Sequence, residues 1–204
     1  MKKLVVLATV FFAATAAQAA GVGVRVGTTG VGGDVAWGVL PTVSARIGYS
    51  ALSWSRRYDT NVATYDGKLK LSNLSALAEF HPLGPVFRIS GGLIFNTNKF
   101  ESTGQPSSGP GSFNATVESG RKAAPYLGIG FGRVAGTGIG LYGDLGLMFM
   151  GSPKATVNAN CSGLTALQCS TLQGQAASEQ ARLQDDMKSF KAFPVLNIGV
   201  SVGF

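Results

Sequence analysis

The chain has 204 residues, of which 29 are glycine and 13% are charged, and its formal net charge is +7. A soluble domain usually carries about 25% charged residues, so this composition disfavours an ordinary soluble protein. The basic residues are scattered along the chain rather than grouped in a run or on one helix, which disfavours a nucleic-acid partner.

The first 19 residues have the features of a secretory signal peptide. Met1-Lys2-Lys3 is a short basic start, an apolar run follows up to Ala17, and Ala17-Gln18-Ala19 has the small residues that signal peptidase recognises. The apolar run is shorter than the about 20 residues of a membrane-spanning helix, which makes a retained N-terminal anchor the less favoured alternative. We therefore predict a signal peptide over residues 1–19 and one mature domain over residues 20–204.

Seven segments of the mature chain alternate apolar residues with small or polar residues. In chain order they lie within residues 22–27, 31–39, 43–50, 87–96, 125–132, 139–149 and 191–204. Side chains along a strand point to opposite faces in turn, so each segment predicts a strand with one apolar face and one small or polar face.

An eighth segment, residues 68–80, is less regular because its apolar phase changes partway. The apolar residues are, in order, Leu69, Leu71, Leu74, Ala76, Ala78 and Phe80. We predict either a β-bulge near Asn73 or a strand whose upper end lies outside the lipid. With this segment the strands number eight, an even number, as in single-chain bacterial outer-membrane barrels.

The connecting segments support the same interpretation. Three are tight turns, at residues 40–41, 81–84 and 134–138, and they alternate with predicted external loops at residues 28–30, 55–67, 103–122 and 152–190, of which only the first is short. Short periplasmic turns and longer external loops are typical of such barrels.

The fold class that follows is all-β: an eight-stranded antiparallel transmembrane β-barrel with a short helix in the last external loop. The alternative is a soluble exported β-sandwich or a lipocalin-like barrel. Its polar faces would be rich in Lys, Glu, Thr and Gln, whereas here the faces opposite the apolar ones are mostly glycine and serine, which suits a narrow interior better.

The C-terminal strand ends in an aromatic residue with apolar residues at alternate positions, namely Phe204, Val202, Val200 and Ile198. This pattern is similar to the signal by which the barrel assembly machinery recognises its clients. The mature chain as a whole resembles the small eight-stranded outer-membrane proteins of the OmpA, OmpX and OmpW type. The resemblance implies the architecture and an assembly role for Phe204, Val202 and Val200, but no particular activity.

If the apolar faces point to lipid, the charged residues of the opposite faces lie in the lumen. They are Arg25, Asp34, Arg46, Glu79, Arg88 and Asp144. Unpaired charges in a narrow, dry interior are costly, so we predict a connected ion-pair network with Tyr126 and Tyr142 as hydroxyl partners. Eight strands enclose a space that side chains fill; we therefore expect a closed lumen, while the inward glycines leave a thin solute path as the alternative.

Two features are predicted outside the barrel. Cys161 and Cys169 are the only cysteines, and after export into an oxidising compartment we expect them to form a disulfide. Apolar residues at helical spacing predict a helix over Thr171 to Phe190, which caps the barrel or faces a partner.

The sequence contains no pattern typical of an enzyme, and we expect no catalytic residue, metal or cofactor. The single histidine, His81, lies in a turn with no nucleophile motif beside it. We predict a bacterial outer-membrane protein with a structural or surface-interaction role through its long external loops; the alternative is a narrow, porin-like channel for a small solute, with Arg25, Arg46 and Arg88 as selectivity charges. The expected partners are outer-membrane lipid, lipopolysaccharide and the barrel assembly machinery.

Overall fold

The computed structural model describes residues 19–59, 63–106 and 110–204. Most of the predicted signal peptide, residues 1–18, therefore lies outside the described residues. Antiparallel ladders join eight strands into a ring in the order β4-β3-β2-β1-β11-β9-β8-β5, which the β4–β5 ladder closes. These strands are β1 (Ala20–Gly27), β2 (Gly30–Leu40), β3 (Val43–Asp59), β4 (Ala63–Phe80), β5 (Arg88–Asn96), β8 (Ala123–Phe131), β9 (Gly138–Met148) and β11 (Phe193–Gly203). The predicted eight-stranded antiparallel ring is confirmed.

The irregular strand β4 contains no bulge near Asn73. Its register against β3 runs without a shift from Val43↔Phe80 to Asp59↔Thr64. The apolar residues change face where the strand leaves the ring. In residues Asn73 to Phe80, which pair with β5, most of the apolar residues are the exposed outward ones, whereas Leu69 and Leu71 lie on the opposite face, towards the part that pairs with β6 beyond the ring. The register irregularity of the ring lies instead in β2, between Gly38 and Leu40.

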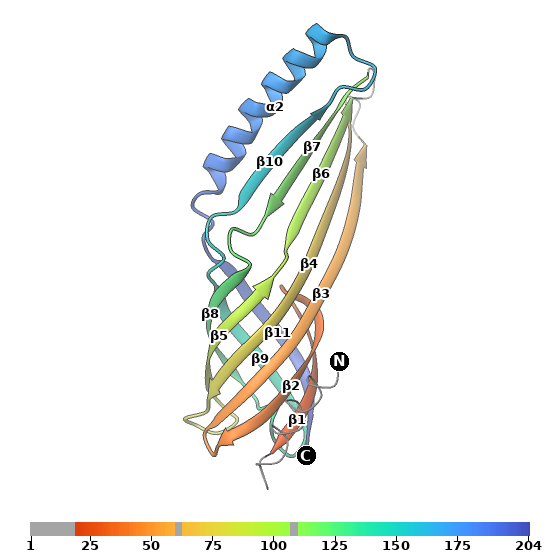
Figure 1. Cartoon of the computed structure of the whole chain (residues 1–204). Coiled ribbons are helices and arrows are strands. Elements are labelled where there is room, and N and C mark those ends of the chain that lie inside the picture. Colours follow the sequence, from red (N-terminus) through yellow and green to blue (C-terminus); the bar gives the residue numbers. More distant parts are fainter. Residues whose placement is uncertain (1–18, 60–62, 107–109) are drawn as a thin grey trace, which may run out of the picture.

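The predicted external loops at residues 55–67 and 103–122 are largely strands, and residues 152–190 contain a strand, Lys154–Asn160, ahead of the helix, so the prediction of loops is wrong for these strand segments. The upper halves of β3 and β4 continue into a sheet with β6 (Lys99–Pro106), β7 (Ser112–Glu118) and β10 (Lys154–Asn160). We call this sheet, together with the helix packed on it, the arm. It rises from one side of the ring (Figure 1).

The helix of the arm, α2 (Ala166–Met187), is 22 residues long and starts five residues earlier than predicted. Thr165 caps its first turn in a capping box with Gln168, which satisfies free backbone N–H groups. The predicted disulfide between Cys161 and Cys169 is confirmed and ties the start of the helix to the end of β10.

The helix runs along β10 in the arm and does not cap the barrel (Figure 1). The Oε1 atoms of Gln184 and Gln180 accept hydrogen bonds from the backbone N–H groups of Ala155 and Val157, both at 3.0 Å. Two donors on the outer edge of β10 are thereby satisfied, which protects that edge from pairing with another strand. Among the described residues, none of the helical structure has the length and apolarity needed to cross a bilayer.

Candidate functional site

The ring has an apolar outer surface and a polar interior. Outward side chains near the middle of the strands are strongly exposed, such as Val24 (66%), Leu141 (64%) and Ile198 (56%). The alternate inward positions are occupied by small, polar and charged residues. This is the reverse of a soluble protein, in which large apolar side chains gather in the core.

The six charged residues that the sequence placed on the inner faces lie together in the lumen, and none is more than 6% exposed. We call them the lumen cluster: Arg25, Asp34, Arg46, Glu79, Arg88 and Asp144. They come from β1, β2, β3, β4, β5 and β9, so the cluster draws on six of the eight strands of the ring.

Arg46 is the centre of the lumen cluster. Its guanidinium donates two hydrogen bonds to the carboxylate of Asp144, at 3.0 and 2.9 Å. Its Nε lies 2.7 Å from Oε1 of Glu79, and its Nη1 lies 3.6 Å from Oδ2 of Asp34. One buried arginine thus meets three carboxylates, and the bidentate geometry with Asp144 is the strongest form of such a contact.

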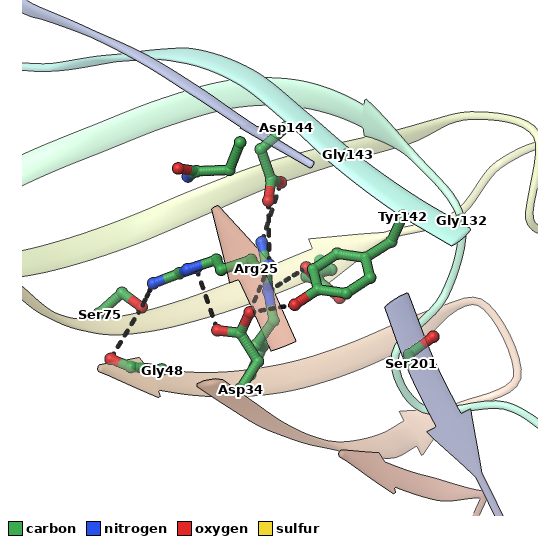
Figure 2. Close-up of polar contacts among 12 residues, drawn as sticks. Arg25, Asp34, Gly48, Ser75, Gly132, Tyr142, Gly143, Asp144 and Ser201 are labelled. Atoms are coloured by element: carbon green, nitrogen blue, oxygen red, sulfur yellow. Dashed lines mark hydrogen bonds and ion pairs between the residues drawn. The ribbon is translucent and has the colours of Figure 1, made fainter. Parts of the chain in front are cut away.

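The other two arginines complete a continuous chain of ion pairs. Arg25 lies 3.0 Å from Asp34 and also donates a hydrogen bond to Ser75 at 3.4 Å (Figure 2). Arg88 donates to Asp144 at 2.7 Å, and its Nε lies 3.5 Å from Glu79. Three cations therefore face three anions, which offsets much of the cost of removing each charge from water.

The two tyrosines of the lumen differ in their roles. The Tyr142 hydroxyl donates a 2.6 Å hydrogen bond to Asp34 (Figure 2). The guanidinium carbons of Arg46 and Arg88 each lie 5.7 Å from the centre of the Tyr142 ring. The Tyr126 hydroxyl has no hydrogen-bond partner among the described residues. The expectation that Tyr126 serves as a hydroxyl partner is therefore wrong; its ring packs in an apolar cluster instead.

That apolar cluster fills the lumen on the arm side of the charges. It consists of Leu77, Ile94, Ala124, Tyr126, Met148 and Val195. A void of about 10 Å³ lies where these residues meet Arg25, Arg46 and Asp144. It has room for about one water molecule at most.

The opposite end of the ring is closed by the turn between β8 and β9. The sequence predicted a simple Gly/Pro turn there, but Val134 (1% exposed) and Ala135 (4%) are folded inward and pack near Ala36 and Tyr142. The Ser201 hydroxyl donates to the carbonyl of Arg133 at 3.2 Å and holds the turn against β11. We call residues 132–137 the plug turn.

Glycines on the neighbouring strands make room for the plug turn. A Cβ on Gly21 would clash with the carbonyl oxygen of Val134, and a Cβ on Gly203 would clash with that of Gly136. Both obstacles are backbone atoms, which cannot rotate away as a side chain can. Glycine at these two positions is therefore the feature of the sequence that indicates where the plug turn packs.

Replacing Gly21 by alanine is therefore expected to displace the plug turn and to lower the free energy of unfolding by about 1–3 kcal/mol, the usual cost of overpacking. Hydrogen exchange at the backbone amides of residues 133–136 should become faster, and urea unfolding should measure the loss. Gly33→Ala is the matched control, because a Cβ there approaches only the Gly23 carbonyl oxygen, at 3.4 Å. Equal stability of the two variants would contradict the packing described for the turn.

The structure brings together three residues that sequence reasoning kept apart. The Ser44 hydroxyl donates to Glu79 at 3.0 Å and lies 2.9 Å from Nε2 of His81. All three side chains are at most 2% exposed. The group has the residue types of a hydrolytic site, but its hydroxyl is buried away from solvent, and the hydroxyl proton is directed at Glu79.

The remaining predicted site residues lie on the surface. Phe204 (72% exposed), Val202 and Val200 point outward from the last strand of the ring. The disulfide lies in the arm, between the residue that follows β10 and the start of α2. Among the residues that the structure describes, no group of His, Cys, Asp and Glu side chains is arranged to hold a metal ion.

The chain matches no protein-family model and no curated protein sequence. Among solved structures it is similar to Acinetobacter baumannii CarO2, with a TM-score of 0.64 and 23% sequence identity over 93% of this chain and 100% of that one. CarO of the same organism gives a TM-score of 0.61 and 24% identity over 90% and 97% of the two chains. A major outer membrane protein from Thermus thermophilus, with a TM-score of 0.45 and 14% identity over 93% and 100%, is too distant to carry an argument. The chain thus has the fold of the CarO barrels, while the narrower resemblance to the OmpA, OmpX and OmpW type stays a prediction.

Proposed function

We propose that this protein is an integral β-barrel of the bacterial outer membrane, closed to solutes, that holds the arm outside the cell as a surface-interaction module. The observation that carries the proposal is the reversed polarity of the ring. Large apolar side chains cover its outside, and its buried interior contains the lumen cluster. Such an apolar outer surface is favourable when it is surrounded by hydrocarbon. A closed barrel can lie in hydrocarbon because its backbone hydrogen bonds are satisfied within the ring.

The outer membrane is the membrane that fits this arrangement. Barrels of this kind are a feature of outer membranes, and the chain starts with a predicted secretory signal and ends in an aromatic residue of the type that the assembly machinery recognises. The tight turns then face the periplasm and the arm faces the exterior. Purified protein should require detergent and should migrate differently on gels before and after boiling; a detergent-free, soluble monomer would refute the proposal.

A closed lumen is supported at three levels. The plug turn blocks the periplasmic end, the lumen cluster bridges the middle, and the apolar cluster around Tyr126 fills the external end. The inward glycines, on which the alternative of a solute channel rests, face side chains that fill the space beside them: a Cβ on Gly23 would clash with Tyr142, and one on Gly128 would clash with Tyr126. We also propose that the protein is not an enzyme, because the Ser44, Glu79 and His81 group is sealed inside the barrel.

We expect no discrete single-channel conductance when the purified protein is inserted in planar bilayers. Arg88→Ala removes a side chain that bonds Asp144 and the backbone carbonyls of Gly132 and Gly143, and it should open a small leak if the charges are the barrier. Steady conductance by the native protein, changed in ion selectivity by Arg88→Ala, would establish the channel instead.

A further inference from the structure

The outward face of the arm sheet carries a row of lysines at the level where the arm leaves the ring. Cross-strand partners share a face of a sheet, and the register pairs Lys70 with Lys99, Lys99 with Glu118, and Glu118 with Lys154. One step further from the ring, Lys68 pairs with Glu101 on the same face. We call these residues the lysine face: Lys68, Lys70, Lys99, Lys154, Glu101 and Glu118.

The lysine face directly follows the apolar surface of the ring. On β4 the last large outward apolar residue is Leu74, followed on the same face by Ser72 and Lys70. At about 3.3 Å per residue, Lys70 lies about 13 Å along the strand from Leu74. A barrel whose apolar surface sits in the hydrocarbon therefore places the lysines beside the head groups of the outer leaflet.

Ion pairs hold Lys70, Lys99, Glu101 and Glu118 of the lysine face in place. Glu101 lies 2.8 Å from Nζ of Lys70 and 3.2 Å from Nζ of Lys99, and Glu118 lies 3.3 Å from Lys99. The hydrogen bonds that Lys99 donates to the carboxylates of Glu101 and Glu118 raise the pKa of Lys99, and the hydrogen bonds that Glu101 accepts from Lys70 and Lys99 lower the pKa of Glu101. Four lysines against two glutamates leave an excess of positive charge.

A polar groove lies on the same side of the arm, next to these lysines. Its volume is about 490 Å³, and its lining includes Ser55, Asp66, Lys68, Glu101 and Thr103. Hydroxyl, carboxylate and ammonium groups without apolar side chains suit a ligand rich in hydroxyl and phosphate groups. An apolar peptide would find no anchor there.

We propose that the lysine face and its groove bind the phosphorylated sugar head group of lipopolysaccharide in the outer leaflet. This inference rests on the proposed outer-membrane function and names the partner of the arm. The location fixes the choice of ligand, because the phosphates of lipopolysaccharide lie directly above its acyl chains, where the lysine face meets the membrane surface. Each basic side chain beside an anionic lipid surface makes a measurable contribution to the binding free energy.

The test compares the native protein with Lys68→Gln/Lys70→Gln, folded in detergent micelles, by titration with fluorescently labelled lipopolysaccharide. The double variant should bind about 10-fold more weakly at low salt. The matched control is Arg182→Gln/Lys188→Gln, which removes the same charge from α2 and its C-cap residue, where both side chains are well exposed. The control should bind lipopolysaccharide with the same affinity as the native protein. Dephosphorylated lipopolysaccharide should bind the native protein weakly, with about the affinity that intact lipopolysaccharide has for the double variant.

Three outcomes would overturn the inference. They are unchanged affinity of Lys68→Gln/Lys70→Gln, an equal loss in the α2 control, and full displacement of lipopolysaccharide by inorganic phosphate, which would indicate a site for the free ion. Heat-modifiable migration on gels, measured for every sample, distinguishes a failure of the outer-membrane function from a failure of the lipopolysaccharide inference. If the native protein shows no such migration, the outer-membrane function fails; if all variants migrate as folded barrels and bind alike, only the lipopolysaccharide inference fails.

Discussion

Replacing Arg46 by alanine is expected to lower the free energy of unfolding by about 3–5 kcal/mol, the usual cost of removing one partner from a buried ion pair. Arg46 meets Asp34, Glu79 and Asp144 at once and is completely buried. Without it the lumen would hold three carboxylates against two arginines in a space that excludes water. Arg46 contacts three opposite charges of the lumen cluster and each other member contacts at most two, so no other single substitution in the cluster removes as many ion pairs.

Urea unfolding in detergent or lipid vesicles measures this effect. The free energy of unfolding of Arg46→Lys should lie between those of the native protein and Arg46→Ala, because lysine keeps the charge but cannot form the bidentate contact with Asp144. Arg182→Ala is the control: its contact with Glu179 is long, at 3.9 Å, and well exposed, so no measurable change is expected. If Arg46→Ala were as stable as the Arg182 control, the lumen cluster would not hold the barrel together.

The second large effect is expected on the outside of the ring. Ile198 lies in the middle of β11 and is 56% exposed. In a bilayer Ile198→Arg places a charge near the centre of the hydrocarbon and should cost about 2–4 kcal/mol. The same change at an exposed position of a soluble protein would alter stability by no more than about 0.5 kcal/mol.

Thr156→Arg on β10 is the matched control for Ile198→Arg. It introduces the same side chain at an exposed strand position, but in the arm and away from the ring. The free energy of unfolding, measured in lipid vesicles, should be clearly lower for Ile198→Arg and almost unchanged for Thr156→Arg. Equal, small effects at both positions would mean that the outer surface of the ring faces water.

Much of the ring could be predicted from the sequence because the side chains of a strand alternate with a period of two. The inward positions of Arg25, Asp34, Arg46 and Asp144 follow directly from that period. Their pairing could be anticipated only in general terms, since the period says which face a residue occupies and not which strands meet across the lumen. The contact between Ser44 and His81 illustrates this limit: it depends on the β3–β4 register.

The arm was the main feature that the sequence did not predict. Its strands β6, β7 and β10 have short or polar residues on the outward face, such as Thr103, Asn114 and Thr116, which are equally common in loops. Pairing of β6 with β4, of β7 with β6 and of β10 with β7, rather than strong local preference, holds them in the sheet. The start of α2 did have a signal, because Thr165 and Gln168 have the spacing of a capping box.

The measurement that tests the central claim most directly is spin labelling along β11 in lipid vesicles. Single cysteines would be placed in turn at residues 196, 197, 198, 200 and 201 in a variant with both native cysteines replaced by serine. We predict that labels at residues 196, 198 and 200 are accessible to oxygen dissolved in the lipid, while labels at 197 and 201 are shielded from both oxygen and water-soluble nickel reagents. High nickel accessibility at residues 196, 198 and 200 would contradict the account, because the apolar face of the ring would then lie in water.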